Sequence, residues 1–182
     1  MPMLRPSREA HGACPALLRD VRPAGAYYLD DMTASKDTDQ WVTPEQFEVW
    51  RQFIRVQSRV LRKLEADLLE HHNLPLAWYD VLVRLLEADE RRLRMSELAD
   101  RVMLSPSGLT RLVDRMVDEG LVSRTPAEGD GRGFYAVLTE TGYERLRDAS
   151  GTHLRGVHEY VVGRFDEQEL AMLTSLLRRI EA

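Results

Sequence analysis

The sequence predicts a mainly α-helical fold with a small β-wing, that is, a winged helix-turn-helix with long helices on both sides. Three observations in residues 95–142 support this prediction: a short helical segment, a longer amphipathic helix directly after it, and two β-rich runs around a glycine-rich tip. The hydrophobic share of 43% in 182 residues is sufficient for a buried core.

The longer helix is expected to begin after Ser105, whose hydroxyl can accept a hydrogen bond from an unpaired amide of the first turn. Pro106 follows at the first helical position, where the missing N–H costs nothing, and Gly120 is the expected C-terminal stop. Apolar residues recur at the spacing of one buried face: Leu109, Leu112, Val113, Met116 and Val117.

The opposite face of this helix carries short polar side chains near its beginning and arginines further along. Small donors beside base edges, with arginines for bases or phosphates, suit a helix that lies in the major groove of DNA. The alternative is an ordinary amphipathic helix with a solvated face. The residues predicted to bind double-stranded DNA, wing and neighbouring segments included, are Ser105, Ser107, Thr110, Arg111, Arg115, Arg132, Arg94 and Arg101.

The segments on either side complete the predicted motif. Ser96 is expected to cap a short helix, Glu97 to Val102, with a turn at Met103-Leu104 before the longer helix. After it, the runs 121–125 and 134–138 predict a hairpin, and 91–95 can add a third strand. Arg132 lies at the glycine-rich tip, where an arginine can enter a minor groove, although a solvated tip is the alternative.

The chain resembles the MarR family of bacterial transcription regulators. The resemblance rests on SELADRVMLSPSGLTRLVDRMVDEGLV and on a wing signature, D-x-R followed by L-T-x-x-G, formed here by Asp130, Arg132, Leu138, Thr139 and Gly142. The resemblance covers residues 43–182. It implies a homodimer that acts as a repressor and whose two winged helices bind an inverted-repeat operator. It also implies that Asp130 braces the wing by pairing with Arg111 or Arg124.

The resemblance further implies a sensing pocket for a small aromatic or anionic effector near the dimer interface. Candidate lining residues are Trp50, Ile54, His72, Tyr79, Arg84 and His153. The alternative for each is an ordinary core or surface residue.

Helices are predicted on both sides of the winged region 76–139. Thr43-Pro44-Glu45-Gln46 forms a capping-box pattern, and the helix after it carries two apolar strips, one of which needs a partner such as a second subunit. A helix from Thr139 to about Arg164 and a final helix capped by Asp166 follow. The segments 43–74 and 140–182 are therefore expected to form the dimerisation helices, with an apolar stripe at Leu170, Leu173, Leu177 and Ile180.

The totals set limits on function. The net charge of −5 does not indicate a nucleic-acid binder, so contact with DNA must come from local arginines. One cysteine, Cys14, fits a reducing cytosol and hence a cytoplasmic protein. Residues 1–42 show no sustained period and predict a mostly disordered tail. No apolar run or signal-type N-terminus predicts contact with a membrane.

Two alternatives to a DNA-binding regulator remain open at this point: a redox sensor that acts through Cys14, and a helical interaction protein that does not bind DNA. An enzyme is not predicted, because the chain has no HExxH, GxSxG, Walker or GxGxxG motif. No metal site or cofactor is predicted either, since His153 and His158 are five residues apart and do not share one helical face.

Overall fold

The computed structural model describes residues 42–102, 105–127 and 133–181. The chain divides into two compact units, Met1–Gln52 and Phe53–Ala182. The predicted tail up to residue 41 with Cys14, the turn at Met103-Leu104, and the wing-tip residues Asp130 and Arg132 lie outside the described residues.

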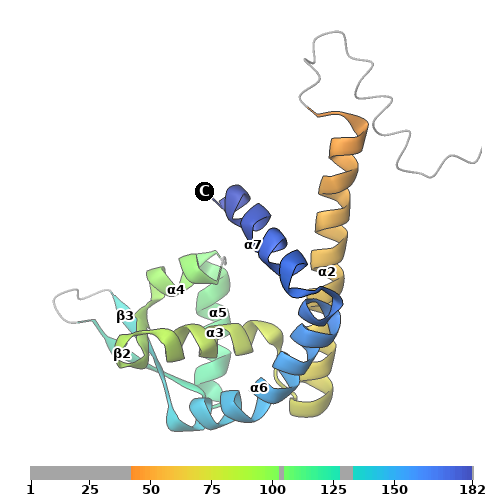
Figure 1. Ribbon diagram of the computed structural model, residues 1–182. Coiled ribbons are helices and arrows are strands. Elements are labelled where there is room, and N and C mark those ends of the chain that lie inside the picture. Colours follow the sequence, from red (N-terminus) through yellow and green to blue (C-terminus); the bar gives the residue numbers. More distant parts are fainter. Residues whose placement is uncertain (1–41, 103–104, 128–132, 182) are drawn as a thin grey trace, which may run out of the picture. The chain divides into compact units, whose positions relative to one another are not determined.

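The described part of the chain is mainly α-helical with one small antiparallel sheet, which confirms the predicted fold class (Figure 1). The helices are α2 (Pro44–His72), α3 (Leu76–Glu87), α4 (Met95–Arg101), α5 (Pro106–Asp118), α6 (Glu140–Tyr160) and α7 (Glu167–Glu181). Two short 3-10 turns, η1 (Asp89–Arg91) and η2 (Val162–Arg164), interrupt the order of helices and strands.

The α2 helix begins and ends where its local signals predict. The Thr43 N–H donates to Oε1 of Gln46 at 2.9 Å, and the Gln46 N–H donates to Oγ1 of Thr43 at 3.3 Å, which is the expected capping box. At the other end, Asn73 takes a positive φ of 47° and stops the helix after His72. Asparagine tolerates this left-handed conformation better than most residues.

The winged region has its own hydrophobic core, to which α3, α4 and α5 each contribute. Leu82 and Leu85 of α3, Leu98 of α4, and Val113 and Met116 of α5 are all fully buried. Figure 1 shows these three helices grouped beside the sheet. The members of this core all lie within residues 68–149, so the winged region buries these side chains in contacts within its own unit.

Two expectations for these helices are wrong. Ser96 does not cap α4, because the helix already starts at Met95 and Arg94 occupies the N-cap position. The Arg94 N–H donates to Oε2 of Glu97 at 3.1 Å, so the strand runs directly into the helix. Val117 was expected on the buried face of α5, but it lies at the edge of that face and is 36% exposed.

The sheet consists of β1 (Arg92–Arg94), β2 (Val122–Pro126) and β3 (Phe134–Leu138). Its strand order is β1-β3-β2, and both pairs are antiparallel. Leu93 of β1 lies opposite Ala136 of β3, and Arg124 of β2 lies opposite the same alanine. The hairpin and the added third strand are thereby confirmed.

The connection between β3 and α6 is held by Thr139. Its Oγ1 accepts from the Gly142 N–H at 3.0 Å and donates to the Gly120 carbonyl at 2.7 Å. A Cβ at Gly142 would lie 2.1 Å from the carbonyl oxygen of Leu121. Only glycine therefore fits this first turn of α6 without displacing the backbone that follows α5.

The C-terminal helices differ from the prediction in one respect. The α6 helix ends at Tyr160 rather than near Arg164, because Val161 leaves helical geometry and η2 follows. The α7 helix begins as predicted, since the Glu169 N–H donates to Oδ1 of Asp166 at 2.9 Å and the Asp166 N–H donates to Oε2 of Glu169 at 3.0 Å.

Candidate functional site

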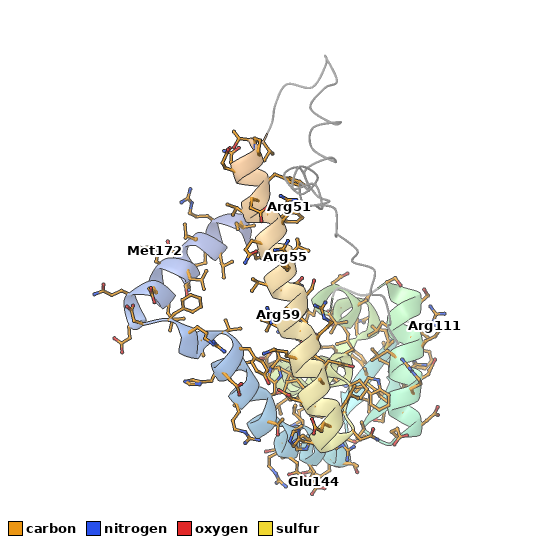
Figure 2. The ribbon with its side chains drawn as sticks, turned by 90° about the vertical axis from the view of Figure 1, so that its right-hand side faces the viewer. Arg51, Arg55, Arg59, Arg111, Glu144 and Met172 are labelled. Atoms are coloured by element: carbon orange, nitrogen blue, oxygen red, sulfur yellow. The ribbon has the colours of Figure 1, made fainter. Side chains whose placement is uncertain are left out.

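The α5 helix presents one buried and one solvent-facing side. Ser105 accepts a hydrogen bond from the Gly108 N–H at 3.2 Å, which fixes the start of the helix. Leu109 is almost completely buried. The predicted DNA-contacting residues of this helix are all exposed: Ser107, Thr110, Arg111 and Arg115. Figure 2 shows Arg111 projecting from α5, away from the buried face of the helix.

An ion pair that the sequence did not predict ties the wing to α5. Nη1 of Arg124, on β2, lies 2.8 Å from Oδ1 of Asp114, and its Nη2 donates to the Thr110 carbonyl at 3.4 Å. Sequence analysis gave a bracing role to Asp130, which lies outside the described residues. The signal that could have indicated Asp114 is its position four residues after Thr110, on the same exposed face of the helix.

The predicted phosphate-contacting arginines outside α5 lie in different surroundings. The guanidinium carbon of Arg94 lies 5.4 Å from the ring centre of Tyr135, and that of Arg92 lies 4.9 Å from the same ring. Cation–π contacts of this kind hold guanidinium groups at a defined place on a surface. Arg101 is exposed at the end of α4. The position of Arg132 lies outside the described residues.

Three of the six candidate effector residues line one cavity. It has a volume of 820 Å³, lies among α2, α3 and α6, and includes Tyr79, Arg84 and His153 in its wall. His72 instead makes a hydrogen bond with Oγ1 of Thr152 at 2.8 Å. Ile54 is exposed on α2, and Trp50 belongs to the N-terminal unit, so both stay predictions.

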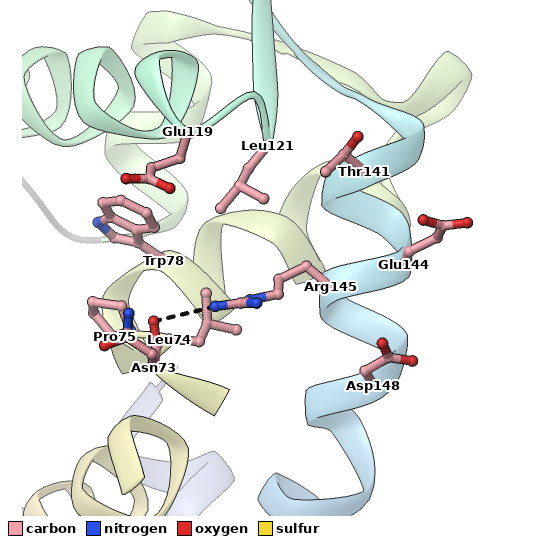
Figure 3. A pocket seen from close by; sticks show the side chains of 10 residues that line it. All are labelled: Asn73, Leu74, Pro75, Trp78, Glu119, Leu121, Thr141, Glu144, Arg145 and Asp148. Carbon is pink, nitrogen blue, oxygen red and sulfur yellow. Dashed lines mark hydrogen bonds between the residues drawn. The ribbon is translucent and has the colours of Figure 1, made fainter. Parts of the chain in front are cut away.

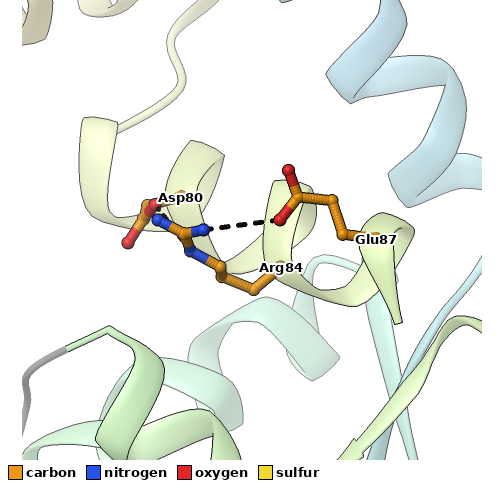
Figure 4. A network of polar contacts seen from close by, with 3 residues as sticks. All are labelled: Asp80, Arg84 and Glu87. Carbon is orange, nitrogen blue, oxygen red and sulfur yellow. Dashed lines mark hydrogen bonds and ion pairs between the residues drawn. The ribbon is translucent and has the colours of Figure 1, made fainter. Parts of the chain in front are cut away.

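The charged groups of this cavity belong to a network on α3. Nε of Arg84 lies 3.5 Å from Oδ1 of Asp80, and its Nη1 lies 3.4 Å from Oε2 of Glu87 (Figure 4). Both carboxylates thus share the single guanidinium group.

The aromatic part of the cavity is a stacked pair. The rings of Tyr79 and His153 have centres 4.3 Å apart with 30° between their planes. Burial lowers the pKa of His153, and the nearby Asp80 opposes this effect without cancelling it. The imidazole is therefore mainly uncharged at neutral pH.

A second cavity of 450 Å³ lies between the end of α2, the end of α5 and the beginning of α6. Arg145 reaches across it, and its Nη2 donates to the His72 carbonyl at 2.6 Å. Figure 3 shows Arg145 extending from α6 toward Asn73, with Trp78 and Glu119 on the far wall. Arg145 thereby satisfies a carbonyl at the C-terminus of α2, which is a structural role.

Among the described helices, none combines the length and apolarity that a bilayer crossing requires. Within the same residues, no group of three histidine, cysteine or acidic side chains is placed to hold a metal ion.

Comparison with known proteins gives a consistent result. The model of the MarR family matches residues 72–133. The HTH-type transcriptional regulator MhqR of Bacillus subtilis is 27% identical over 128 residues, which are 69% of this chain and 86% of that protein.

Two solved structures from Streptomyces coelicolor are also similar. AbsC, a MarR family transcriptional regulator, is 34% identical with a TM-score of 0.72, over 78% of this chain and 95% of that one. Sco3205, a MarR family transcriptional regulator solved in complex with DNA, is 33% identical with a TM-score of 0.73, over 78% of this chain and 89% of that one.

Proposed function

The chain belongs to the MarR family of transcription regulators, and from this premise we propose that it is a homodimeric repressor that binds an inverted-repeat operator and responds to a small effector. It is a DNA-binding regulator and not an enzyme. The observation that carries the proposal is the exposed polar face of α5 opposite a face on which Leu109, Val113 and Met116 are buried. The DNA complex of Sco3205 supports the same use of the fold.

In this proposal α5 enters the major groove. Ser107, Thr110 and Arg111 contact base edges, because short hydroxyls and a guanidinium group can reach donors and acceptors there. Phosphates are contacted by a second set, which positions the helix without reading sequence: Ser105, Arg115, Arg94 and Arg101. Arg132 is proposed to reach the minor groove, with Asp130 bracing the wing.

The proposed dimer uses the segments 43–74 and 140–182. Support comes from apolar side chains that are exposed in the described chain, among them Val56 of α2, and Leu177 and Ile180 of α7. When two copies pair about a two-fold axis, each copy covers the exposed apolar face of the other. The resulting dimer would present two α5 helices to half-sites about one helical turn apart.

The effector is proposed to bind in the 820 Å³ cavity among α2, α3 and α6. Its position between the helices of the proposed dimer interface and α3, which supports the winged region, allows a ligand to change the spacing of the two α5 helices. A ligand that binds better to the spacing unsuited to the operator would release DNA. The cytoplasm is the proposed location.

The test is selection of duplexes from a random-sequence library on the purified full-length protein, followed by binding assays. We expect an enriched inverted repeat, with affinity that falls steeply as salt rises. Arg111→Ala should weaken binding to the selected sequence by about tenfold to a hundredfold, since one base contact contributes about 1–3 kcal/mol. Arg147→Ala, an exposed arginine of α6, is the matched control and should have little effect.

The same experiment separates the remaining alternatives. A helical interaction protein would enrich no sequence, and this result would refute the proposal. A redox sensor would release the selected duplex after peroxide treatment in the native chain but not in Cys14→Ser.

A further inference from the structure

The wall of the 820 Å³ cavity is mostly apolar. Five aliphatic side chains contribute to it from α2, α3 and α6: Leu61, Leu64, Leu76, Val83 and Leu154. Leu154 is 63% exposed, so it shapes the mouth of the cavity rather than the core of the protein. A flat apolar molecule that enters would remove this surface from water.

The charges of the wall oppose an anionic ligand. Three carboxylates, Glu65, Asp80 and Glu87, face two guanidinium groups, Arg62 and Arg84, so the formal charge is −1. Glu65 accepts from the Leu76 N–H at 2.6 Å, which holds its carboxylate at the wall. Arg84 already pairs with the other two carboxylates, as Figure 4 shows. A ligand carboxylate would have to compete for that guanidinium group.

The same wall offers an unused polar atom. Nδ1 of His153 is buried, and no described group makes a hydrogen bond with it. A buried polar atom without a partner costs free energy that a ligand can recover. A hydroxyl group can donate or accept, so it suits either tautomer of the imidazole, whereas a carboxylate can only accept.

We propose that this cavity takes an uncharged, hydroxyl-bearing aromatic molecule in preference to an aromatic carboxylate, with the ligand hydroxyl bound to Nδ1 of His153. The ring of the ligand lies against the apolar wall beside the stacked Tyr79 and His153 rings. The regulatory meaning of this preference rests on the proposed function, but the preference itself is a property of the cavity.

The first experiment compares two probes of equal size, 2-naphthol and 2-naphthoate, by calorimetric titration of the full-length protein at pH 7.5. We expect 2-naphthol to bind at least about tenfold more tightly, which is the effect of one hydrogen bond and one avoided charge conflict. Equal affinities, tighter binding of the naphthoate, or no binding of either probe would overturn the proposal.

Two variants identify the groups responsible. His153→Phe keeps a ring against Tyr79 and removes Nδ1, so the affinity for 2-naphthol should fall about tenfold while that for 2-naphthoate stays unchanged. Glu87→Gln frees part of Arg84 and removes one negative charge, so the affinity for 2-naphthoate should rise several-fold while that for 2-naphthol stays unchanged. Glu87 is exposed, so its replacement leaves folding intact. Equal changes for both probes in both variants would contradict the assignment.

Binding to the selected duplex, measured on the same preparations, separates the two proposals. A protein that prefers 2-naphthol but binds no duplex would refute the proposed function and leave the ligand preference standing. A protein that binds the duplex but prefers 2-naphthoate would refute only the ligand preference.

Discussion

Two helices of the same unit, α5 and α7, illustrate opposite ways of using an amphipathic sequence. Four apolar residues of α5, Leu109, Leu112, Val113 and Met116, are covered by the chain itself, whereas Val117 is 36% exposed. The apolar residues in the second half of α7 are exposed, since Leu177 is 43% and Ile180 is 75% exposed. Both sequences repeat apolar residues every three or four positions, so periodicity alone does not distinguish them.

The difference separates the part of the molecule that buries its apolar residues in its own contacts from the part that is proposed to pack against a second copy. The winged region is closed, and it can hold the polar face of α5 in one position. The exposed apolar surface of α7 is the surface that the proposed second copy would bury. Substitutions in the first region should act on unfolding, and substitutions in the second should act on association.

The largest effect is expected from Gly142→Ala in the first turn of α6, which packs against the end of the closed winged region. The added Cβ would lie 2.1 Å from the Leu121 carbonyl oxygen, so the backbone after α5 must move. We expect a loss of about 2–4 kcal/mol in the free energy of unfolding, by the mechanism of overpacking. Urea denaturation monitored by circular dichroism measures it.

Gly151→Ala in the same helix is the matched control. The nearest atom to its new Cβ is Nη1 of Arg155 at 3.6 Å, which is an ordinary contact. Because alanine favours a helix interior over glycine, this variant should gain up to about 1 kcal/mol. Equal losses in both variants would show that close packing at Gly142 is not the cause.

The next largest effect is expected in the open region, on association rather than on unfolding. Leu177→Asp places a charge on the exposed apolar stripe of α7. In a two-fold symmetric dimer both copies carry this charge, so the interface contains two of them. We expect the dimer dissociation constant to rise by about a hundredfold, which corresponds to about 3 kcal/mol. Analytical ultracentrifugation over a range of concentrations measures this constant.

Ser175→Asp adds the same charge on the opposite side of α7 and should leave the dissociation constant within about twofold. A native chain that sediments as a monomer would contradict the proposed dimer at once. If both variants remained dimeric, α7 would be excluded from the dimer interface, and its exposed apolar residues would need another explanation.

Local signals explain how much of the fold the sequence could predict. Ser105 and Pro106 predict the start of α5, and Gly120 predicts its end. In the structure Ser105 is the N-cap, Pro106 is the first helical residue, and Gly120 takes a positive φ just after the helix. Thr139 and Asp166 mark two more helix starts in the same way. These signals depend on neighbouring residues only, so they can be found without knowing the tertiary structure.

Errors arose where a tertiary context decides the outcome. Ser96 is a good capping residue, but β1 continues through Arg94 because it pairs with β3, and the helix begins before the serine. For the site, the exposed residues of α5 followed from periodicity. The Asp114–Arg124 pair did not, because it depends on how β2 lies against α5. The grouping of Tyr79, Arg84 and His153 was implied by the family resemblance and not by any pattern.

A smaller effect is expected from Asp114→Asn on the polar face of α5. The pair with Arg124 is partly exposed, so the free energy of unfolding should fall by at most about 1 kcal/mol. Losing a carboxylate near phosphates should strengthen non-specific DNA binding, while the looser link between α5 and β2 should prevent an equal gain for the selected duplex. We expect the ratio of specific to non-specific affinity, measured by fluorescence anisotropy, to fall about threefold.

Asp118→Asn, at the end of the same helix, removes an equal charge from another exposed position. It should strengthen both kinds of binding alike and leave the ratio unchanged. A fall of the ratio in both variants would mean that charge alone, and not the link to β2, sets the specificity.

The smallest effect concerns His153 of α6, which stacks on Tyr79 in the wall of the 820 Å³ cavity. Burial lowers its pKa below the usual 6.5, so below that pH the unfolded chain binds a proton more readily than the folded one. The stability contributed by the neutral imidazole is therefore complete above about pH 6.5 and is lost as the pH falls below it. The free energy of unfolding should decrease between pH 7.5 and 5.5 more in the native chain than in His153→Phe. His158→Phe, an exposed histidine of α6, should keep the native pH dependence. If His153→Phe also kept the native pH dependence, burial would not be what lowers the pKa of His153, and the imidazole in the cavity wall would not be held uncharged.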